Sequence, residues 1–320
     1  MKHIISLSAA REQMPKQSQL RFRLRKYRLV YLLILPPVLA ILVFCYLPMV
    51  GITMAFLNYR LGSGVLGMFT RPWIGLANFK SLLMSYYFTR VLFNTIWISL
   101  LKLIFVFPSP ILLALLLNEL RALRFKRVVQ TVSYLPFFLS AVVVQGLVLA
   151  VFSPAYGLLN NLRQLFGAQA IHYLGDSSYF RGIIVGTDVW QQMGWGAIVY
   201  LAAITSIDPG LYEAAVIDGA GRLRQAWHIT LASIIDIILM FFILRIGTIL
   251  SAGFEMIFLL YSPVVYNVAD IIDTYAYREG LLRSNFGYGT AIGLFKSAVG
   301  FLLIWVTNRA VRRLGGQGIW

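Results

Sequence analysis

Six long apolar runs divide this chain, and charged, glycine-rich or proline-rich stretches separate each run from the next. The runs lie at about 29–57, 91–117, 128–152, 182–204, 233–251 and 286–307. Each is close to or above the ~20 residues that a helix needs to cross about 30 Å of hydrocarbon. Because backbone polar groups in lipid must be satisfied within the segment, the pattern predicts an all-α membrane protein with six transmembrane helices.

The composition agrees with this pattern. Hydrophobic residues make up 59% of the 320 residues and charged residues 12%, whereas a soluble domain has roughly 45–50% and 25%. The single cysteine, Cys45, lies inside the first run, so no intrachain disulfide can form. The chain is therefore expected to be a polytopic membrane protein.

The connection between the fourth and fifth runs is polar and rich in turn-forming residues. Ser206 or Asp208 can cap a helix, and the proline that follows suits a first turn, where its missing N–H loses no partner. Gly219 and Gly221 then end the helix, because glycine tolerates the positive φ found at helix C-termini. The pattern predicts a helix over 209–217, roughly nine residues and ~14 Å long.

The same connection carries Glu213-Ala214-Ala215, then Gly219, then Ile229-Thr230-Leu231 after nine further residues. This spacing resembles the EAA loop of permease subunits in binding-protein-dependent ABC importers. In that family the loop, here about 206–232, forms a coupling helix that docks onto the ATPase subunit. The family pattern usually closes with proline, where this chain has Ala232. The resemblance assigns ATPase coupling to Glu213, Ala214, Ala215, Asp218, Gly219 and Gly221.

Nine segments outside this loop carry further motifs, at 35–37, 46–48, 73–79, 94–95, 107–108, 114–119, 130–136, 270–275 and 291–297. Together they resemble one group of that family, the permeases for complex carbohydrates related to the larger permease of the maltose importer. The resemblance implies a type I permease fold. It also implies a second permease subunit, two ATPase subunits, an extracytoplasmic solute-binding protein, a sugar substrate and membrane lipid as partners. The ATPase chains would bind ATP and Mg, so no cofactor is expected in this chain.

The net charge of +16 is distributed unevenly over the predicted loops. One set of loops and both termini hold seventeen basic residues: Lys2, Arg11, Lys16, Arg21, Arg23, Arg25, Lys26, Arg28, Arg121, Arg124, Lys126, Arg127, Arg222, Arg224, Arg309, Arg312 and Arg313. The opposite loops hold eight: Arg60, Arg71, Lys80, Arg90, Arg163, Arg181, Arg278 and Arg283. The positive-inside rule then places both termini and the Glu213 loop on the cytoplasmic side of a bacterial inner membrane. The charge thus indicates topology and not a nucleic-acid partner.

Residues 1–28 form a basic N-terminal tail. Within it, 19–27 alternates basic and apolar residues, which predicts a segment lying at the membrane surface. A cleaved signal peptide is the alternative, but the apolar run that follows is too long for a signal core and lacks a clear small-residue cleavage site. The permease domain is expected over 29–307, followed by a cytoplasmic C-terminal tail at 308–320.

No constellation for catalysis or metal binding stands out. Gly62-Ser63-Gly64-Val65-Leu66-Gly67 fits a dinucleotide-binding fingerprint, but no predicted strand precedes it and no helix follows to hold a pyrophosphate. No phosphate-binding loop for ATP is present in the sequence. His3, His172 and His228 lie in different segments and give no metal-site spacing. Catalytic, cofactor-binding and metal-binding residues are therefore not expected.

Polar side chains inside the apolar runs are costly in lipid and usually face protein or a water-filled cavity. Two interpretations remain open: these residues hold the bundle together through hydrogen bonds and ion pairs, or they line a path for a polar solute. Amides and carboxylates suit sugar hydroxyls, and tryptophan rings suit the apolar faces of sugars. The candidates for such a path are Asn94, Asp188, Trp190, Gln191, Trp195, Arg245 and Glu255.

The function predicted from these features is that of a permease subunit of an ATP-driven ABC importer, which takes up an oligosaccharide or polysaccharide by alternating access. The subunit itself would catalyse no reaction. Three basic residues at membrane depth, Lys102, Arg245 and Lys296, favour an acidic sugar such as a uronate oligomer. The larger permease of an alginate importer is one member of the group that fits.

The alternative class is a secondary transporter driven by a proton or sodium gradient. Its ion-coupled acid would be Asp188, Asp236 or Glu255. Such a transporter has no need of the Glu213 loop, and the sequence shows no inverted repeat of the kind common in that class. A third class, a membrane enzyme acting on lipid or glycan, would require a reactive constellation that the sequence does not show.

Overall fold

The structure, a computed structural model, describes residues 26–59, 62, 64, 66–313, 315, 316, 318 and 319. Within these residues the chain is almost entirely helical, and the β-structure is limited to one isolated bridge between Leu57 and Trp73. The all-α prediction is thus confirmed. The predicted basic tail, apart from residues 26–28, lies outside the described residues.

Three helices in the described part of the chain are long and apolar enough to cross a membrane. The first joins α3 (Arg28–Ile41), the π-helix η1 (Leu42–Tyr46) and the 3-10 helix η2 (Leu47–Phe56). The second joins α6 (Tyr86–Phe105) and α7 (Pro108–Glu119), and the third is α19 (Phe286–Arg313). Pro108 opens α7, where its missing N–H interrupts the hydrogen-bond ladder of the preceding helix.

The apolar run at 128–152 forms two helices, which corrects the expectation of one continuous helix there. α8 (Leu123–Tyr134) and η3 (Leu135–Phe138) are separated from α9 (Ala141–Phe152) by a bend of 108°. Pro136 in η3 cannot donate a helical hydrogen bond, and the two residues after η3 have extended backbones. The Ser140 hydroxyl then caps α9 by accepting a hydrogen bond from the Val143 N–H at 3.4 Å.

A second bend, of 63°, lies in the fifth run. It separates the segment formed by α13 (Arg222–Gln225), η4 (Ala226–Thr230) and α14 (Leu231–Ser233) from α15 (Ile235–Gly247). The fourth run lies in α11 (Ser177–Thr205), which has 29 residues and is long enough to cross a membrane although polar side chains lower its hydropathy. Within the described residues, the six predicted runs therefore correspond to three long apolar helices, two bent pairs and α11.

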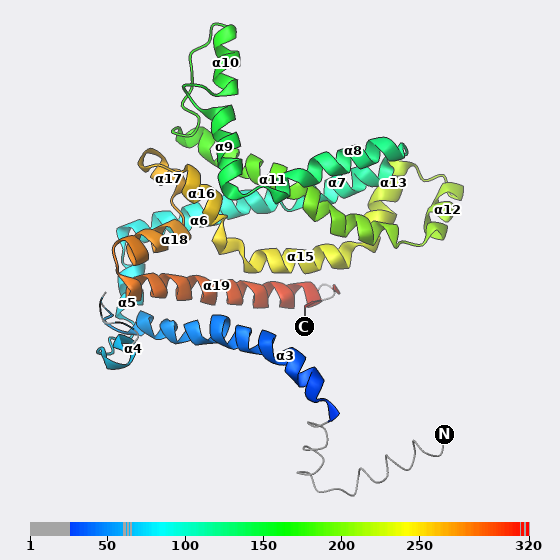
Figure 1. Ribbon diagram of the computed structural model, residues 1–320. Coiled ribbons are helices and arrows are strands. Elements are labelled where there is room, and N and C mark those ends of the chain that lie inside the picture. Colours follow the sequence, from blue (N-terminus) through cyan, green and yellow to red (C-terminus); the bar gives the residue numbers. More distant parts are fainter. Residues whose placement is uncertain are drawn as a thin grey trace, which may run out of the picture.

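Shorter helices connect these spans. They are α4 (Gly67–Thr70), α5 (Ala77–Leu83), α10 (Leu158–Leu165), α12 (Pro209–Ile217), η5 (Ile249–Ser251), α16 (Phe254–Leu260), η6 (Pro263–Val265), α17 (Tyr266–Ala269), α18 (Ile272–Ala276) and η7 (Tyr277–Leu282). In Figure 1, α12 lies at one end of the bundle and α4, α5 and α18 lie at the other. The start of α3 and the end of α19 both point toward the α12 end.

The centre of the bundle is built around α11, which packs against α7, α8 and η3 (Figure 1). Two glycines of α11 allow its neighbours to approach closely. A methyl group at Gly194 would overlap the Ser133 carbonyl of α8, and one at Gly196 would crowd Pro110 of α7. A buried cluster of Ile111, Ala114, Ala197, Tyr200, Ile204 and Ile234 joins α7, α11 and the segment before α15. This packing fixes α11 and α15 beside each other. The whole of α3, in contrast, has no buried residue.

Candidate functional site

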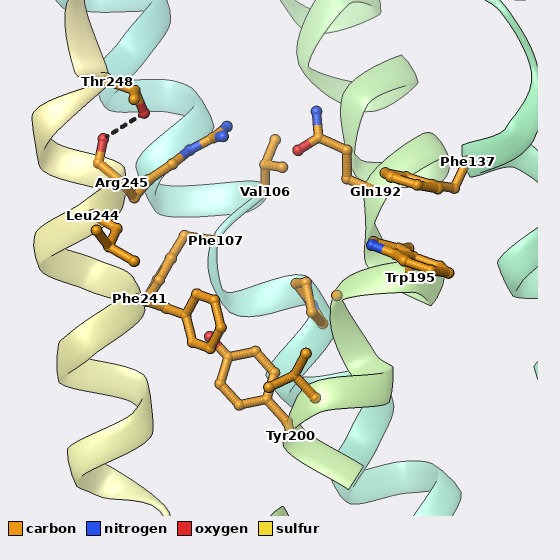
Figure 2. Close-up of a pocket in the computed structure, with 13 residues that line it drawn as sticks. Val106, Phe107, Phe137, Gln192, Trp195, Tyr200, Phe241, Leu244, Arg245 and Thr248 are labelled. Carbon is orange, nitrogen blue, oxygen red and sulfur yellow. Dashed lines mark hydrogen bonds between the residues drawn. The ribbon is translucent and has the colours of Figure 1, made fainter. Parts of the chain in front are cut away.

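A cavity of about 420 Å³ opens between α7, η3, α11 and α15 (Figure 2). Its aromatic part has two pairs of rings. Trp195 stacks on Phe137 with ring centroids 4.7 Å apart and planes 4° from parallel. Tyr200 meets Phe241 edge-on, with centroids 5.8 Å apart. Flat apolar rings of this kind match the apolar faces of sugar rings.

The polar part of this cavity is formed by Arg245, Gln192 and Thr248. In Figure 2 the side chains of Arg245 and Gln192 point toward each other across the cavity. A second cavity of about 330 Å³ also has these three residues in its wall, so the two spaces are neighbours. The Thr248 hydroxyl donates a hydrogen bond to the Arg245 carbonyl at 3.2 Å. The Arg245 guanidinium has no ion pair with a described residue, and it therefore presents an uncompensated positive charge to both cavities.

A buried ion pair forms part of the wall of the second cavity. The Lys102 ammonium lies 2.5 Å from the Asp188 carboxylate, and the two side chains are only 4% and 8% exposed. Lys102 also donates a hydrogen bond to the Ala252 carbonyl at 2.6 Å. Ala252 and Gly253 both have positive φ, at 45° and 82°, where η5 gives way to α16. Lys102 thus ties together α6, α11 and this sharp turn.

The three basic residues expected at membrane depth have different environments. Lys102 is neutralised by Asp188, and Lys296 bonds both carboxylate oxygens of Asp273 at 2.7 and 2.8 Å. Arg245 alone of the three lacks such a partner among the described residues. A negatively charged solute in the cavity would consequently meet Arg245 as its counter-charge.

Four of the seven candidate path residues are absent from the walls of both cavities, namely Asn94, Glu255, Trp190 and Gln191. Asn94 is buried: its amide donates to the Asp270 carbonyl at 3.1 Å, and its oxygen accepts from Arg181 at 2.8 Å. These bonds join α6 to α11 and to the end of α17, which is a structural role. Glu255 is an exposed residue of α16 and is absent from the walls of both cavities.

The candidates on α11 are divided by helical periodicity. Asp188, Gln192 and Trp195 lie at i, i+4 and i+7, hence on one face, and all three contribute to a cavity wall. Trp190 lies on the opposite side of the helix. Gln191, at i+3 from Asp188, borders the same face but belongs to neither cavity wall, and its side chain donates to the Leu139 carbonyl at 3.3 Å. The site also includes Gln192, Phe137, Tyr200 and Phe241, which were not among the residues predicted for the path. Spacing from Asp188 along the helix was the signal that could have identified Gln192.

The segment between α15 and α19 holds a further charged cluster, which does not belong to the walls of these cavities. Arg278 makes two hydrogen bonds to the Asp270 carboxylate, at 3.1 and 2.6 Å, and lies over the Tyr266 ring. Burial alone would lower the pKa of Arg278, but the Asp270 hydrogen bonds and charge raise that pKa above its usual value. Burial also raises the pKa of Tyr261 to about 12. Arg278 therefore stays charged and Tyr261 stays neutral at physiological pH.

The helix predicted at 209–217 is present as α12, and the prediction of its bounds is confirmed. The Asp208 carboxylate caps it by accepting a hydrogen bond from the Gly210 N–H at 2.9 Å. At its end, the Gly219 N–H donates to the Val216 carbonyl and the Ala220 N–H donates to the Ala215 carbonyl, with Gly219 at φ +73°. This is a Schellman motif, which requires a left-handed residue where glycine stands.

α12 has no buried residue among those described, so most of its surface at the end of the bundle is left uncovered by the described chain. It is held at its base, where the Tyr212 hydroxyl lies 2.9 Å from that of Thr230. Glu213 and Ala214 are exposed, and Ala215 is half-buried. The exposed apolar side chains nearby are Leu211, Val216, Ile217, Leu223 and Trp227. Exposed apolar side chains that gather on one surface are available for contact with another protein or with lipid.

Comparison with known proteins places the chain in a clear context. Residues 106–316 match the family described as "Binding-protein-dependent transport system inner membrane component". The chain is 44% identical over 305 residues to the polygalacturonan/rhamnogalacturonan transport system permease protein YteP of Bacillus subtilis, covering 95% of this chain and 94% of YteP. It is 41% identical over 296 residues to protein LplB of the same organism, covering 92% of each.

Two solved structures are also similar. One is a bacterial ABC transporter involved in the import of the acidic polysaccharide alginate, with a TM-score of 0.85 and 40% identity over 92% of this chain and 99% of that one. The other is a bacterial alginate ABC transporter in complex with an alginate pentasaccharide-bound periplasmic protein. Its TM-score is 0.85 and its identity 38%, over 94% and 100% of the two chains.

Proposed function

The chain belongs to the family of inner membrane components of binding-protein-dependent transport systems, and on this premise we propose that it forms the path for an acidic oligosaccharide or polysaccharide. It is a carbohydrate permease subunit of an ABC importer and not an enzyme. The observation that carries the acidic substrate is the unpaired Arg245 guanidinium in a cavity with stacked aromatic rings. Polygalacturonan and alginate, named for its relatives, are both chains of uronic acids.

The proposed assembly has a second permease subunit, two cytoplasmic ATPase subunits and an extracytoplasmic binding protein. The exposed α12, with its apolar neighbours, is the surface we assign to the ATPase, through Glu213, Ala214, Ala215, Asp218, Gly219 and Gly221. Both chain termini are proposed to be cytoplasmic. This topology is supported by the common end of the bundle toward which α12, the start of α3 and the end of α19 point (Figure 1).

The connectivity around α12 suggests how motion would reach the cavity. α11 carries Gln192 and Trp195 and leads into α12, whereas α15 carries Arg245 and follows α12 through the 63° bend. A displacement of α12 by the ATPase would therefore act on both walls of the cavity. When the ATPase pair closes on ATP, the two walls of the cavity would move apart or together, as alternating access requires.

The ion-gradient alternative fits the structure less well. Asp188 is nearly buried and paired with Lys102 at 2.5 Å, and Glu255 is exposed on α16. The decisive experiment is uptake of oligogalacturonate by vesicles that contain the full transporter with its binding protein. We expect uptake to require internal ATP and to be insensitive to collapse of proton and sodium gradients. Uptake that persists without ATP and follows an ion gradient would contradict the proposal.

Arg245→Gln tests the acidic substrate directly. Removing the charge while keeping a polar side chain is expected to lower uptake of a uronate oligomer about ten-fold, since a charge-assisted contact is worth roughly 1.5–3 kcal/mol. Arg245→Lys keeps the charge and should retain most of the uptake. Affinity at the separate binding protein should not change. Equal uptake rates for the glutamine and lysine variants would assign Arg245 a packing role.

Trp195→Ala and Trp190→Ala form a matched pair on one helix. Only Trp195 is in the cavity wall, where it stacks on Phe137, and both rings are similarly exposed. An aromatic stacking contact contributes about 0.5–1.5 kcal/mol, so Trp195→Ala should lower uptake and substrate-stimulated ATP hydrolysis several-fold. Trp190→Ala should have a clearly smaller effect. The same loss in both variants would show that α11 acts through packing and not through this wall.

A further inference from the structure

The end of α19 forms a hollow that is separate from the translocation cavities. It measures about 370 Å³ and is lined by Trp305, Asn308, Arg309, Arg312 and Arg313. No carboxylate is present among the described residues of its wall. Three guanidinium groups around one hollow make a strongly positive site, which would attract a ligand with negative charge.

In the turns of α19 that precede this hollow in the sequence, one side of the helix is apolar and exposed. Phe301, Leu302 and Trp305 are 67%, 58% and 48% exposed, and they lie at i, i+1 and i+4. Arg309 follows one turn after Trp305, with its guanidinium 5.6 Å from the centre of the indole ring. The surface therefore changes along the helix from apolar to aromatic to cationic. This order matches the acyl chains, the interface and the headgroup of a lipid.

The wall of the hollow is held in place by the last described residues. Asn308 is buried, and its side-chain oxygen accepts a hydrogen bond from the Ile319 N–H at 2.8 Å. The Gly316 N–H donates to the Val311 carbonyl at 3.1 Å. Gly318 lies so close to Asn308 and Arg312 that a methyl group there would crowd both side chains. The chain thus folds back on α19 and fixes the base from which the arginines project.

We propose that this hollow binds the phosphodiester headgroup of an anionic phospholipid, with its acyl chains along Phe301, Leu302 and Trp305. Guanidinium groups bind phosphate oxygens through paired hydrogen bonds, and Arg309 and Arg313 have no ion pair with a described residue. A free phosphate would use the arginines alone. The adjoining apolar strip favours a lipid, because it gives the acyl chains a surface as well. This inference is independent of the transported substrate.

The test uses the full-length chain, extracted in mild detergent with the subunits that co-purify. Binding of dioleoyl phosphatidylglycerol, dioleoyl phosphatidylethanolamine and soluble glycerol phosphate is titrated by native mass spectrometry. The test variant is Arg309→Gln/Arg313→Gln. The matched control is Arg124→Gln/Arg127→Gln, which removes the same charge from two exposed arginines of α8. Both variants are first checked for unchanged elution and melting temperature.

We expect the wild-type chain to prefer phosphatidylglycerol over phosphatidylethanolamine. The α19 double variant should bind phosphatidylglycerol about ten-fold or more weakly, since each basic residue near a membrane surface contributes about 1 kcal/mol toward anionic lipid. The control variant should bind it as wild type does. The proposal is overturned if the two double variants bind alike, if wild type shows no lipid preference, or if glycerol phosphate displaces the lipid stoichiometrically.

Discussion

Gly219→Leu should uncouple ATP hydrolysis from sugar uptake, or prevent the ATPase from co-purifying with this subunit. Gly219 stands at φ +73° in the Schellman motif that ends α12. A side chain in this conformation costs about 1–2 kcal/mol. The isolated chain has open space around a Cβ at this position. The larger effect is therefore expected where the proposed ATPase presses against the end of the helix.

Two further substitutions separate strain from bulk in this prediction. Gly219→Asn should retain much of the activity, because asparagine tolerates the left-handed conformation. Gly221→Leu adds the same bulk at φ −68° and should have a smaller effect. Glu213→Ala should weaken coupling mildly through loss of one exposed charge. ATP hydrolysis, uptake in reconstituted vesicles and co-purification of the ATPase are measured together. If Gly219→Leu has wild-type ATP hydrolysis, uptake and co-purification of the ATPase, α12 does not couple the ATPase to transport.

The structure of the Glu213 loop was predictable because it depends on neighbouring residues. The Asp208 cap and the Gly219 turn follow from side chains within one or two turns of helix. The bend before α15, in contrast, does not follow from the residue that the family pattern places there. The family pattern has proline after the Ile-x-Leu motif, yet here a 63° bend forms after Ala232 and Ser233 without one. Packing of Ile234 in the core therefore sets this bend instead of proline.

The broken run at 128–152 shows the limit of hydropathy. The whole run is apolar enough for one span, and Pro136 indicates a local interruption of the helix. The direction of α9 after that break depends on contacts with α16, which is more than 100 residues away in sequence. Hydropathy therefore located the apolar run but not its 108° bend.

The path residues were only partly predictable for a related reason. The cost of burial identifies polar residues in a membrane span but not the direction in which each side chain points. Asn94 and Asp188 looked alike in sequence, yet Asn94 bonds Arg181 and a carbonyl, whereas Asp188 borders a cavity. Arg245 and Gln192 face each other because α15 and α11 line opposite sides of one cavity (Figure 2). That pairing exists only in the folded bundle.

Lys102→Met should destabilise the protein more than the loss of any other ion pair among the described residues. It leaves the Asp188 carboxylate buried without its counter-charge and the Ala252 carbonyl without its donor. Breaking one partner of a buried ion pair costs about 3–5 kcal/mol, whereas replacing both partners by apolar residues is often neutral. Lys102→Met/Asp188→Leu should therefore recover most of the lost stability. Thermal unfolding in detergent, followed by size-exclusion chromatography, measures this difference.

Lys296→Met is the matched control for this prediction. Its pair with Asp273 has a similar distance, 2.7 Å, but the two side chains are 24% and 22% exposed. Since water already screens and solvates that pair, its loss should cost much less. Transport gives a second measure: the Lys102→Met variant leaves a negative charge without its ion pair in the wall of the cavity that Arg245 also lines, and it should take up an acidic sugar less well. If the Lys102→Met and Lys296→Met variants have the same melting temperature, the Lys102–Asp188 pair does not hold α6, α11 and the turn before α16 in place.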